Sequence, residues 1–247
     1  MYKLCVIGDP VAHSLSPAIH TELLRQQGLE GRYTTVTVRP EELAAFVAGA
    51  RQGDYDGFNV TMPHKQTILS LLEAVEGDAA AMGAVNTVVV RRGRAVGYNT
   101  DGSGFHRSLP FPLKGKLVLI LGAGGAASAV SNAAARAGAV AALCCRQPKK
   151  AAALPGTAYP WGALPALAAE CDLLVNATPL GMTGCASFPD FHFLDRCRGC
   201  VYDLVYQPRE TALLAAAEAR GLKTIGGLAL LHAQAELAFD LFVGKTE

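Results

Sequence analysis

Residues 116–146 read KLVLILGAGGAASAVSNAAARAGAVAALCCR, and this stretch decides the fold of the chain around it. Leu117–Leu121 is an unbroken apolar run, which is typical of a strand buried on both faces of a parallel sheet. A glycine-rich turn separates this strand from an alanine-rich helical segment that extends to Gly138, and a second apolar run follows over residues 139–144. The order of strand, glycine turn, helix and strand predicts one βαβ unit of a dinucleotide-binding fold.

Each small residue of the turn has a physical role in such a unit. Gly122 permits a tight exit from the strand, and Gly124 lets backbone N–H groups approach a pyrophosphate above the helix N-terminus. Ala127 stands where a small side chain allows the helix and the strand to pack closely. A glycine turn alone also occurs for purely structural reasons, but the readable strands and helix on either side favour a nucleotide site here.

The segment after the second strand indicates which nucleotide binds. An NAD site places a carboxylate there, about 20 residues past the glycines, to hold the ribose 2′-hydroxyl. Residues 145–150 contain no carboxylate but include Arg146, Lys149 and Lys150. Because a guanidinium with nearby ammonium groups suits a 2′-phosphate, we expect NADP as the cofactor. A solvated basic turn without a ligand is the alternative.

The bulk composition limits the classes of partner. At 247 residues and 51% hydrophobic residues, the chain can bury one large core or two ordinary ones. The net charge of +1 supplies no general attraction for nucleic acid, and no apolar run approaches the ~20 residues that a membrane helix needs. The N-terminus lacks the pattern of a secretion signal, so we expect a cytoplasmic protein that acts on a small molecule.

The cysteine pattern agrees with a reducing compartment. Seven is an odd number, and Cys144 and Cys145 are adjacent, which is not typical of a disulfide framework. Cys197 and Cys200 form a single C-x-x-C without a second pair or a nearby histidine, so we expect no metal site.

Two serines follow the first predicted strand, residues 4–7. Ser16 precedes Pro17 and is expected to be the N-cap of a helix that extends to about Gly28. Capping does not explain Ser14, which belongs to the loop above the carboxyl end of the strand, where open α/β sheets bind ligands.

A lysine follows the predicted strand Gly57–Val60 in the segment Thr61-Met62-Pro63-His64-Lys65. Pro63 is expected to begin a helix through residue 72, which places Lys65 in the first helical turn. The helix dipole disfavours a positive charge there, so the position of Lys65 indicates a function. His64 could carry protons, but beside a proline at a helix start a structural role is favoured.

The order of the elements predicts two α/β domains. Residues 1–101 alternate strands and helices, with a hairpin over residues 85–97, and form the first domain. Residues 102–227 form the second, Rossmann-like domain, in which strands over residues 172–175 and 201–205 end in polar loops at the same edge as the glycine turn. An apolar helix over residues 228–242 is expected to return the C-terminal segment 228–247 to the first domain.

Six segments, taken together and in order, resemble the shikimate dehydrogenase family over nearly the whole chain. These segments are Ser14-Leu15-Ser16-Pro17, Asn59-Val60-Thr61-Met62-Pro63-His64-Lys65, Gly83-Ala84-Val85-Asn86-Thr87, Asn99-Thr100-Asp101-Gly102, the glycine turn and Asn176-Ala177-Thr178-Pro179-Leu180-Gly181-Met182. The resemblance implies the NADP-dependent, reversible conversion of 3-dehydroshikimate to shikimate in aromatic amino-acid biosynthesis. It also implies an active site in a cleft between the two domains.

The same resemblance implies roles for single residues. Lys65 and Asp101 match the catalytic pair of the family. The positions that match its substrate contacts are Ser14, Ser16, Thr61, Asn86, Tyr206 and Gln234. The positions that match its cofactor contacts are Gly122, Ala123, Gly124, Gly125, Ala126, Arg146, Thr178, Leu204 and Gly227. Lys150 is a further candidate cofactor contact because of its charge beside Arg146.

Departures from the family pattern leave alternatives open. Cys145-Arg146-Gln147 replaces the frequent Asn-Arg-Thr, which puts the grip on a 2′-phosphate in question, and Ala229 and Leu230 stand where Gly and Met are frequent. A broader enzyme that also oxidises quinate is one alternative; the small side chains of Ser14 and Ser16 favour shikimate. A silent NADP-sensing regulator is another, and the intact Lys65 and Asp101 argue against it. Alone, these two residues could form an ordinary ion pair. Monomer and homodimer are equally compatible with the sequence.

Overall fold

The computed structural model describes residues 1–245 as two compact units. Unit 1 contains Met1–Gly104 and the chain from His232 onward, and unit 2 contains Phe105–Leu231. The boundaries fall inside helices α4 (Asp101–Arg107) and α9 (Leu228–Val243), a few residues from positions 101 and 227. The predicted α/β fold with a second, Rossmann-like part is confirmed.

Unit 1 is built on a mixed six-stranded sheet with the strand order β2-β1-β3-β5-β6-β4. The pairs β1–β2 and β1–β3 are parallel, whereas β5 runs antiparallel to both β3 and β6. The parallel strands place the loops after β1 and β3 at one edge of the sheet, as expected for a ligand site. The six strands are β1 (Tyr2–Gly8), β2 (Gly31–Thr37), β3 (Gly57–Val60), β4 (Ala74–Val75), β5 (Thr87–Arg91) and β6 (Arg94–Tyr98).

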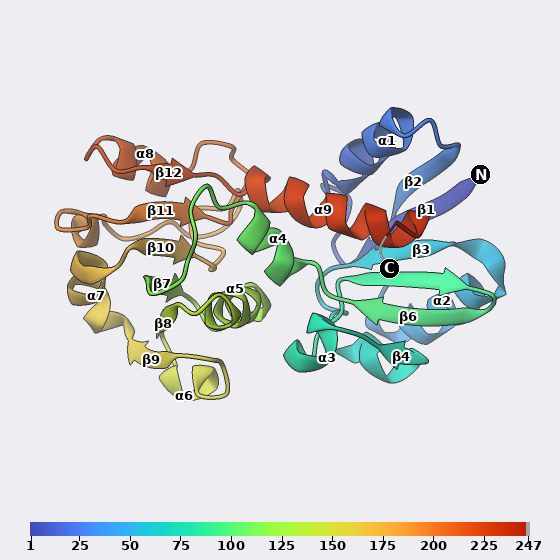
Figure 1. Cartoon of the computed structure of the whole chain (residues 1–247), viewed down its shortest axis with the longest axis horizontal. Helices are drawn as coiled ribbons and strands as arrows, with labels where there is room; N and C mark the ends of the chain where they lie inside the picture. The colour runs from blue at the N-terminus through green and yellow to red at the C-terminus, as the bar shows by residue number, and fades with distance from the viewer. Residues whose placement is uncertain (246–247) are drawn as a thin grey trace. The chain divides into compact units, whose positions relative to one another are not determined.

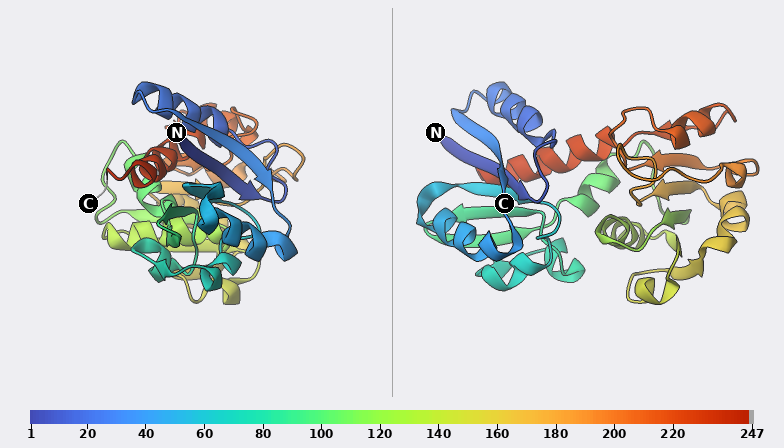
Figure 2. Two further views of the ribbon diagram at one scale, coloured as in Figure 1. Left: turned by 90° about the vertical axis from the view of Figure 1, so that its right-hand side faces the viewer. Right: turned by 180° about the vertical axis from the view of Figure 1, so that it is seen from behind.

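Helices cover both faces of this sheet. Successive residues of a strand point to opposite sides, so the apolar side chains of β1 need a covering layer on each face. Cys5 and Ile7 face α2 (Leu43–Gly49) and α3 (Asp78–Met82), while Leu4 and Val6 face Ala238 and Phe242 of α9. The helix α1 (Ser16–Gln26) lies on the same side as α9 (Figures 1 and 2). Both layers of strand side chains are therefore buried, which explains the continuous apolar run of β1.

Unit 2 contains a wholly parallel six-stranded sheet with the order β12-β11-β10-β7-β8-β9 (Figure 1). This is the order of a doubly wound dinucleotide-binding sheet, in which the winding reverses between β7 and β10. Ligands of such sheets bind at the carboxyl ends of the strands beside that reversal. The strands are β7 (Leu117–Leu121), β8 (Val140–Cys145), β9 (Thr157–Pro160), β10 (Leu173–Asn176), β11 (Cys200–Asp203) and β12 (Thr224–Ile225).

The two faces of this sheet are also covered by different helices. Val118 and Ile120 pack with α5 (Gly125–Arg136), whereas Leu119 and Leu121 pack with α7 (Leu164–Glu170) and α8 (Ala212–Glu218). The short α6 (Pro148–Ala151) follows β8 directly. The predicted strand, turn, helix and strand of residues 116–146 are thus confirmed, and β7 has the predicted bounds.

Two local predictions are wrong. Ser16 is the first residue of α1 rather than its N-cap; Leu15 holds the cap position, and Ser14 Oγ accepts a hydrogen bond from the Ser16 backbone N–H over 3.2 Å. No α-helix begins at Pro63: residues 62–66 form turns and Thr67–Leu71 is a 3₁₀ helix, η3. Lys65 therefore does not lie in the first turn of an α-helix, because a proline alone does not fix which helical pattern follows.

Within residues 1–245, no helix combines the length and the apolar character that crossing a bilayer requires.

The core of unit 1 contains a histidine that has no hydrogen-bond partner among residues 1–245. His20 is fully buried, and its ring stacks on Tyr33 with centroids 4.2 Å apart and the planes 2° from parallel. Phe239 and Phe242 of α9 lie against the same ring. Because burial without a partner penalises the charged imidazolium, the pKa of His20 falls from 6.5 to about 3.

We expect this histidine to weaken the fold in mild acid. The unfolded chain takes up a proton on His20 below pH 6.5, while the folded chain does not until about pH 3, so stability is lost as the pH falls through that window. The contribution approaches about 1.4 kcal/mol per pH unit. Urea unfolding at several values between pH 7.5 and 5 measures the slope. His20→Phe should flatten it by that amount; an unchanged slope in the variant would contradict the assignment.

Candidate functional site

Lys65 and Asp101 meet in unit 1. Lys65 lies in the turns between β3 and η3, and Asp101 is the first residue of α4. Lys65 Nζ lies 2.6 Å from Asp101 Oδ2, and the two side chains are 29% and 19% exposed. The pair is therefore partly shielded yet open to a small molecule. An ammonium and a carboxylate in such contact can pass a proton to or from a bound hydroxyl or carbonyl group.

Asn86 holds the other oxygen of the carboxylate. Its Nδ2 donates to Asp101 Oδ1 over 2.8 Å and to Thr100 Oγ1 over 3.0 Å. Its Oδ1 accepts from the Thr100 backbone N–H over 2.9 Å. Asn86 is only 3% exposed, so this amide has one orientation and fixes the direction of the carboxylate.

A second asparagine shapes the same loop and was not among the predicted site residues. Asn99 Oδ1 accepts from the Asp101 backbone N–H over 3.0 Å, while its Nδ2 donates to the Ala84 carbonyl over 2.9 Å. It therefore ties the segment before α4 to the segment before Asn86. The sequence does contain a signal for this role, because Asn99 begins the motif Asn99-Thr100-Asp101-Gly102, which is one of the segments that resemble the family.

Of the other predicted substrate contacts of unit 1, Ser14, Ser16 and Thr61 lie at the ends of elements, whereas Gln234 lies within helix α9. Ser14 and Ser16 lie at the start of α1, and Ser16 is buried. Thr61 follows β3 and receives a backbone hydrogen bond from His64, and its methyl group lies against Gly8 at the end of β1. Gln234 of α9 packs against Gly104, three residues after Asp101.

Tyr206 belongs to unit 2, in the loop after β11. It is half-buried, and burial raises the pKa of its phenol. Its phenol therefore remains a neutral donor near pH 7.

His64, the tempting proton carrier, is fully buried. Its Nε2 donates to the Val38 carbonyl over 2.6 Å, which ties the turn before η3 to the end of β2. This position agrees with the structural role expected from the sequence.

In unit 2 the glycine turn leaves β7 with a backbone that only glycine adopts easily. Gly122 has a φ of +116°, and a Cβ there would lie 3.1 Å from the Ala177 carbonyl oxygen at the end of β10. By contrast, a Cβ at Gly124 or Gly125 would meet nothing within 4 Å. The turn is thus tight towards the sheet and open above the N-terminus of the 12-residue helix α5, where N–H groups can hold phosphate oxygens.

A pocket of about 1000 Å³ opens beside this turn. It is lined by the turn, by the end of β8 and by the loop after β10, which are the two sides of the reversal in the strand order. The predicted cofactor residues that line it are Gly122, Ala123, Gly124, Arg146, Lys150 and Thr178.

The remaining predicted cofactor residues lie outside this lining. Gly125 and Ala126 form the first turn of α5. Leu204 follows β11, and Gly227 lies so close that a Cβ on it would be 2.4 Å from the Leu204 carbonyl oxygen. These four residues border unit 2 at the carboxyl side of its sheet.

The two basic side chains at the pocket are available for an anion. Arg146 and Lys150 are exposed, and no ion pair of either is found within residues 1–245. No carboxylate lines the pocket. The residues present therefore fit a nucleotide with an extra phosphate better than one with a free ribose hydroxyl.

A buried carboxylate holds the loops beside the pocket and was missed by sequence reasoning. Asp203 accepts hydrogen bonds from Thr211 Oγ1, Asn176 Nδ2 and the Val205 backbone N–H over 2.6, 2.9 and 3.0 Å. Burial raises the pKa of Asp203, and these three donors oppose the rise. Asn176 Oδ1 in turn accepts from Thr178 Oγ1 over 2.6 Å. An aspartate that ends an apolar strand was the available signal.

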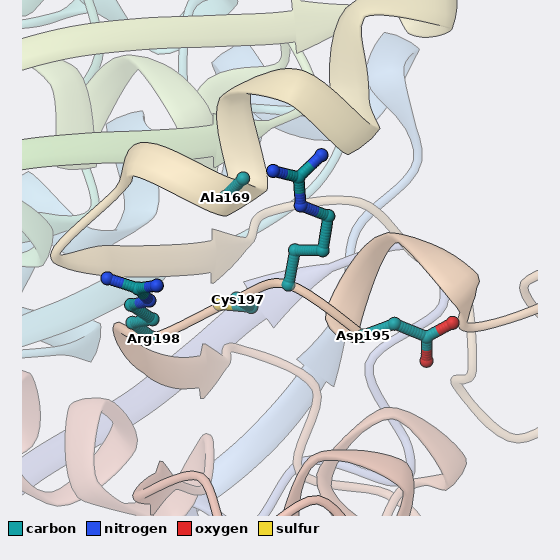
Figure 3. Close-up of a pocket in the computed structure, with 5 residues that line it drawn as sticks. Ala169, Asp195, Cys197 and Arg198 are labelled. Atoms are coloured by element: carbon teal, nitrogen blue, oxygen red, sulfur yellow. The ribbon is translucent and has the colours of Figure 1, made fainter.

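A smaller pocket of about 280 Å³ lies elsewhere on unit 2 and contains none of the predicted residues (Figure 3). Cys197 lines it, with Asp195 and Arg198 on either side. The neighbouring Cys171 thiol lowers the pKa of Cys197. No group of three or more metal-ligand side chains occurs among the residues that the structure describes.

The fold, the Lys65–Asp101 pair and the large pocket beside the glycine turn define a class of protein. It is an α/β protein with a doubly wound nucleotide-binding unit and a second unit that carries an amine–carboxylate pair. A family model described as shikimate dehydrogenase substrate binding domain matches residues 6–88. The NADP(+) shikimate dehydrogenase of Acidiphilium cryptum is 43% identical, over 98% of this chain and 90% of that protein. This chain belongs to the shikimate dehydrogenase family.

Solved structures agree with this assignment. The shikimate 5-dehydrogenase of Thermus thermophilus, in complex with NADP(H) and shikimate, superposes with a TM-score of 0.90 at 40% identity, covering 99% of this chain and 94% of that chain. The shikimate 5-dehydrogenase of Listeria monocytogenes, in complex with shikimate and NAD, gives 0.87 at 32% identity, covering 99% and 92%.

Proposed function

We propose that this protein is an NADP-dependent shikimate dehydrogenase, which reversibly reduces 3-dehydroshikimate to shikimate. The observation that carries the proposal is the 2.6 Å contact of Lys65 with Asp101 beside the buried Asn86, in a chain of this family. A regulator that only senses NADP has no need of such a pair.

Lys65 and Asp101 manage the proton of this reaction. The cofactor, when bound, would supply the hydride as NADPH in the direction of reduction and accept it as NADP+ in the reverse direction. In the direction of reduction the Lys65 ammonium donates a proton to the oxygen of the substrate carbonyl, and in the reverse direction the amine takes it back. Asp101, held by Asn86 on one oxygen, keeps the lysine pointed at the reacting oxygen and stabilises its positive charge.

The remaining polar side chains bind a carboxylate and three hydroxyl groups. Ser14 and Ser16 donate to the substrate carboxylate, and the other contacts pair with hydroxyl groups. A site of this kind rejects analogues that leave a buried polar group unpaired. The residues that would bind the substrate are Ser14, Ser16, Thr61, Asn86, Tyr206 and Gln234.

The second unit holds the dinucleotide. The turn from Gly122 to Ala126 and the N-terminus of α5 bind the pyrophosphate, and Arg146 with Lys150 binds the 2′-phosphate. Thr178, Leu204 and Gly227 complete the cofactor site.

A cytoplasmic location is part of the proposal. All seven cysteines are free thiols, as a reducing compartment maintains them. The active species is a monomer or a homodimer, which sedimentation of the purified protein distinguishes.

The direct test follows the nicotinamide absorbance with shikimate and quinate, each with NADP and NAD. We expect shikimate with NADP to be the preferred pair. Quinate carries one more hydroxyl on the carbon that bears the carboxylate, next to the predicted contacts of Ser14 and Ser16. Equal rates with both substrates would favour the broader quinate and shikimate enzyme, and the absence of turnover with both would contradict the proposal.

Lys65→Met should lower kcat by about 10²–10⁴-fold, because the variant keeps the length of the side chain but loses the proton carrier. Binding of NADP, measured by fluorescence titration, should change little, since the basic residues of the nucleotide pocket are untouched. Lys3→Met, a change of a partly exposed lysine in unit 1 whose Nζ donates to the Gly53 carbonyl, is the matched control and should keep full turnover. A Lys65→Met variant with ordinary turnover would remove this residue from the mechanism.

Arg146→Gln should raise the KM for NADP by about tenfold or more while changing the KM for NAD less than twofold, since a lost charge-assisted contact costs about 1.5–3 kcal/mol. Arg198→Gln removes an exposed arginine of the same unit at the other pocket, and should alter neither constant. Parallel increases for both cofactors in Arg146→Gln would mean that another group reads the 2′-phosphate.

A further inference from the structure

Tyr33 occupies a central position in unit 1 that the proposed mechanism does not use. It lies on β2, is 5% exposed, and is stacked on the buried ring of His20. Its hydroxyl donates to Asn59 Oδ1 over 2.6 Å. This side chain thus joins α1, through the ring of His20, to the interior of the sheet.

From Tyr33 the hydrogen bonds continue in a single direction towards the Lys65–Asp101 pair. Because Asn59 Oδ1 accepts from the phenol, its Nδ2 faces away and donates to Thr87 Oγ1 over 3.0 Å and to the Asn86 carbonyl over 3.1 Å. The Thr87 hydroxyl, having accepted, donates to Asn86 Oδ1 over 2.9 Å.

The last hydrogen bond of the chain joins the Asn86 amide to the Asp101 carboxylate. With its Oδ1 facing Thr87 and Thr100, Asn86 directs Nδ2 at Asp101 Oδ1 over 2.8 Å. Reversing either amide would set two acceptors against each other: Asn59 Oδ1 would face the Asn86 carbonyl, or Asn86 Oδ1 would face the Asp101 carboxylate. The hydroxyls of Tyr33 and Thr87 complete the network by donating to the two amide oxygens. Because these side chains are buried, a hydrogen bond lost here is not readily replaced by solvent.

We propose that Tyr33 is a positioning residue for the reaction: its hydroxyl holds the Asn59 amide in place and, through Thr87 and Asn86, steadies the Asp101 carboxylate. The inference rests on the proposed function. A tyrosine suits this task because burial raises the pKa of Tyr33 well above its usual value, so the phenol is a donor at every working pH.

Tyr33→Phe removes the hydroxyl and keeps the ring on His20. We expect kcat/KM for shikimate to fall by about tenfold, the size of a lost buried hydrogen bond, with the KM for NADP unchanged. Tyr55→Phe is the matched control, a tyrosine of the same unit whose ring packs on Phe46 and whose hydroxyl forms no hydrogen bond among the described residues. It should keep wild-type constants.

The double variant with Asn86→Ala separates positioning from a general loss of structure. If Tyr33 acts through Asn86, adding Tyr33→Phe to Asn86→Ala should lower kcat/KM for shikimate by less than about twofold further. Thr87→Val removes the hydroxyl that joins Asn59 to Asn86, so this single variant should lose kcat/KM for shikimate as Tyr33→Phe does. An undiminished tenfold loss in the Asn86→Ala background, or a normal Thr87→Val enzyme, would overturn the proposal.

A readout without turnover keeps the inference apart from the proposed function. In the wild-type protein the side-chain amide protons of Asn59 and Asn86 should exchange slowly with solvent by NMR, and in Tyr33→Phe they should exchange faster at an unchanged melting temperature. If the wild-type protein oxidises no shikimate, the proposed function fails, and the exchange data alone then decide whether Tyr33 orders the amides. Unchanged exchange would reject the positioning role.

Discussion

The carboxylate of Asp101 is held on both of its oxygens, and the arrangement of the candidate active site depends on this constraint. Lys65 contacts one oxygen and Asn86 the other. A partly exposed ion pair alone has little energetic preference for one geometry, because solvent screens it and both side chains can move. The neutral amide supplies what the ion pair lacks, since its donor and acceptor ends cannot be exchanged inside a buried network.

Unit 2 contains a similar arrangement of a carboxylate and an asparagine amide at the carboxyl ends of its strands. Asp203 is buried at the end of β11 and collects three donors, one of which is the Asn176 amide at the end of the neighbouring strand β10. Asn176 then orients Thr178 in the pocket. In both units, therefore, an asparagine buried at a strand end transfers the rigidity of the sheet to a loop that carries predicted ligand contacts.

Much of this arrangement was predictable from the sequence, and the misses have physical reasons. Leu117–Leu121 and its glycine turn were readable because a strand buried on both faces is apolar throughout and Gly122 needs a positive φ. The proposed helix at Pro63 failed because a proline is compatible with several kinds of turn. Asn59 and Asp203 were missed as site residues because their roles depend on partners 28 and 8 residues away, which only the fold brings together.

The two candidate sites differ in how much order the protein provides before a ligand arrives. Around Asp101, buried hydrogen bonds fix the polar groups in advance, which favours discrimination between similar small molecules. At the proposed nucleotide pocket Arg146 and Lys150 are exposed and have no ion-pair partner among residues 1–245, so binding there would order two long side chains and gain a screened attraction in return. Selection of the cofactor should therefore depend on ionic strength, whereas selection of the substrate should not. The reason is that the proposed nucleotide pocket would select its ligand by exposed charges, whereas the site around Asp101 would select by buried hydrogen-bond donors and acceptors.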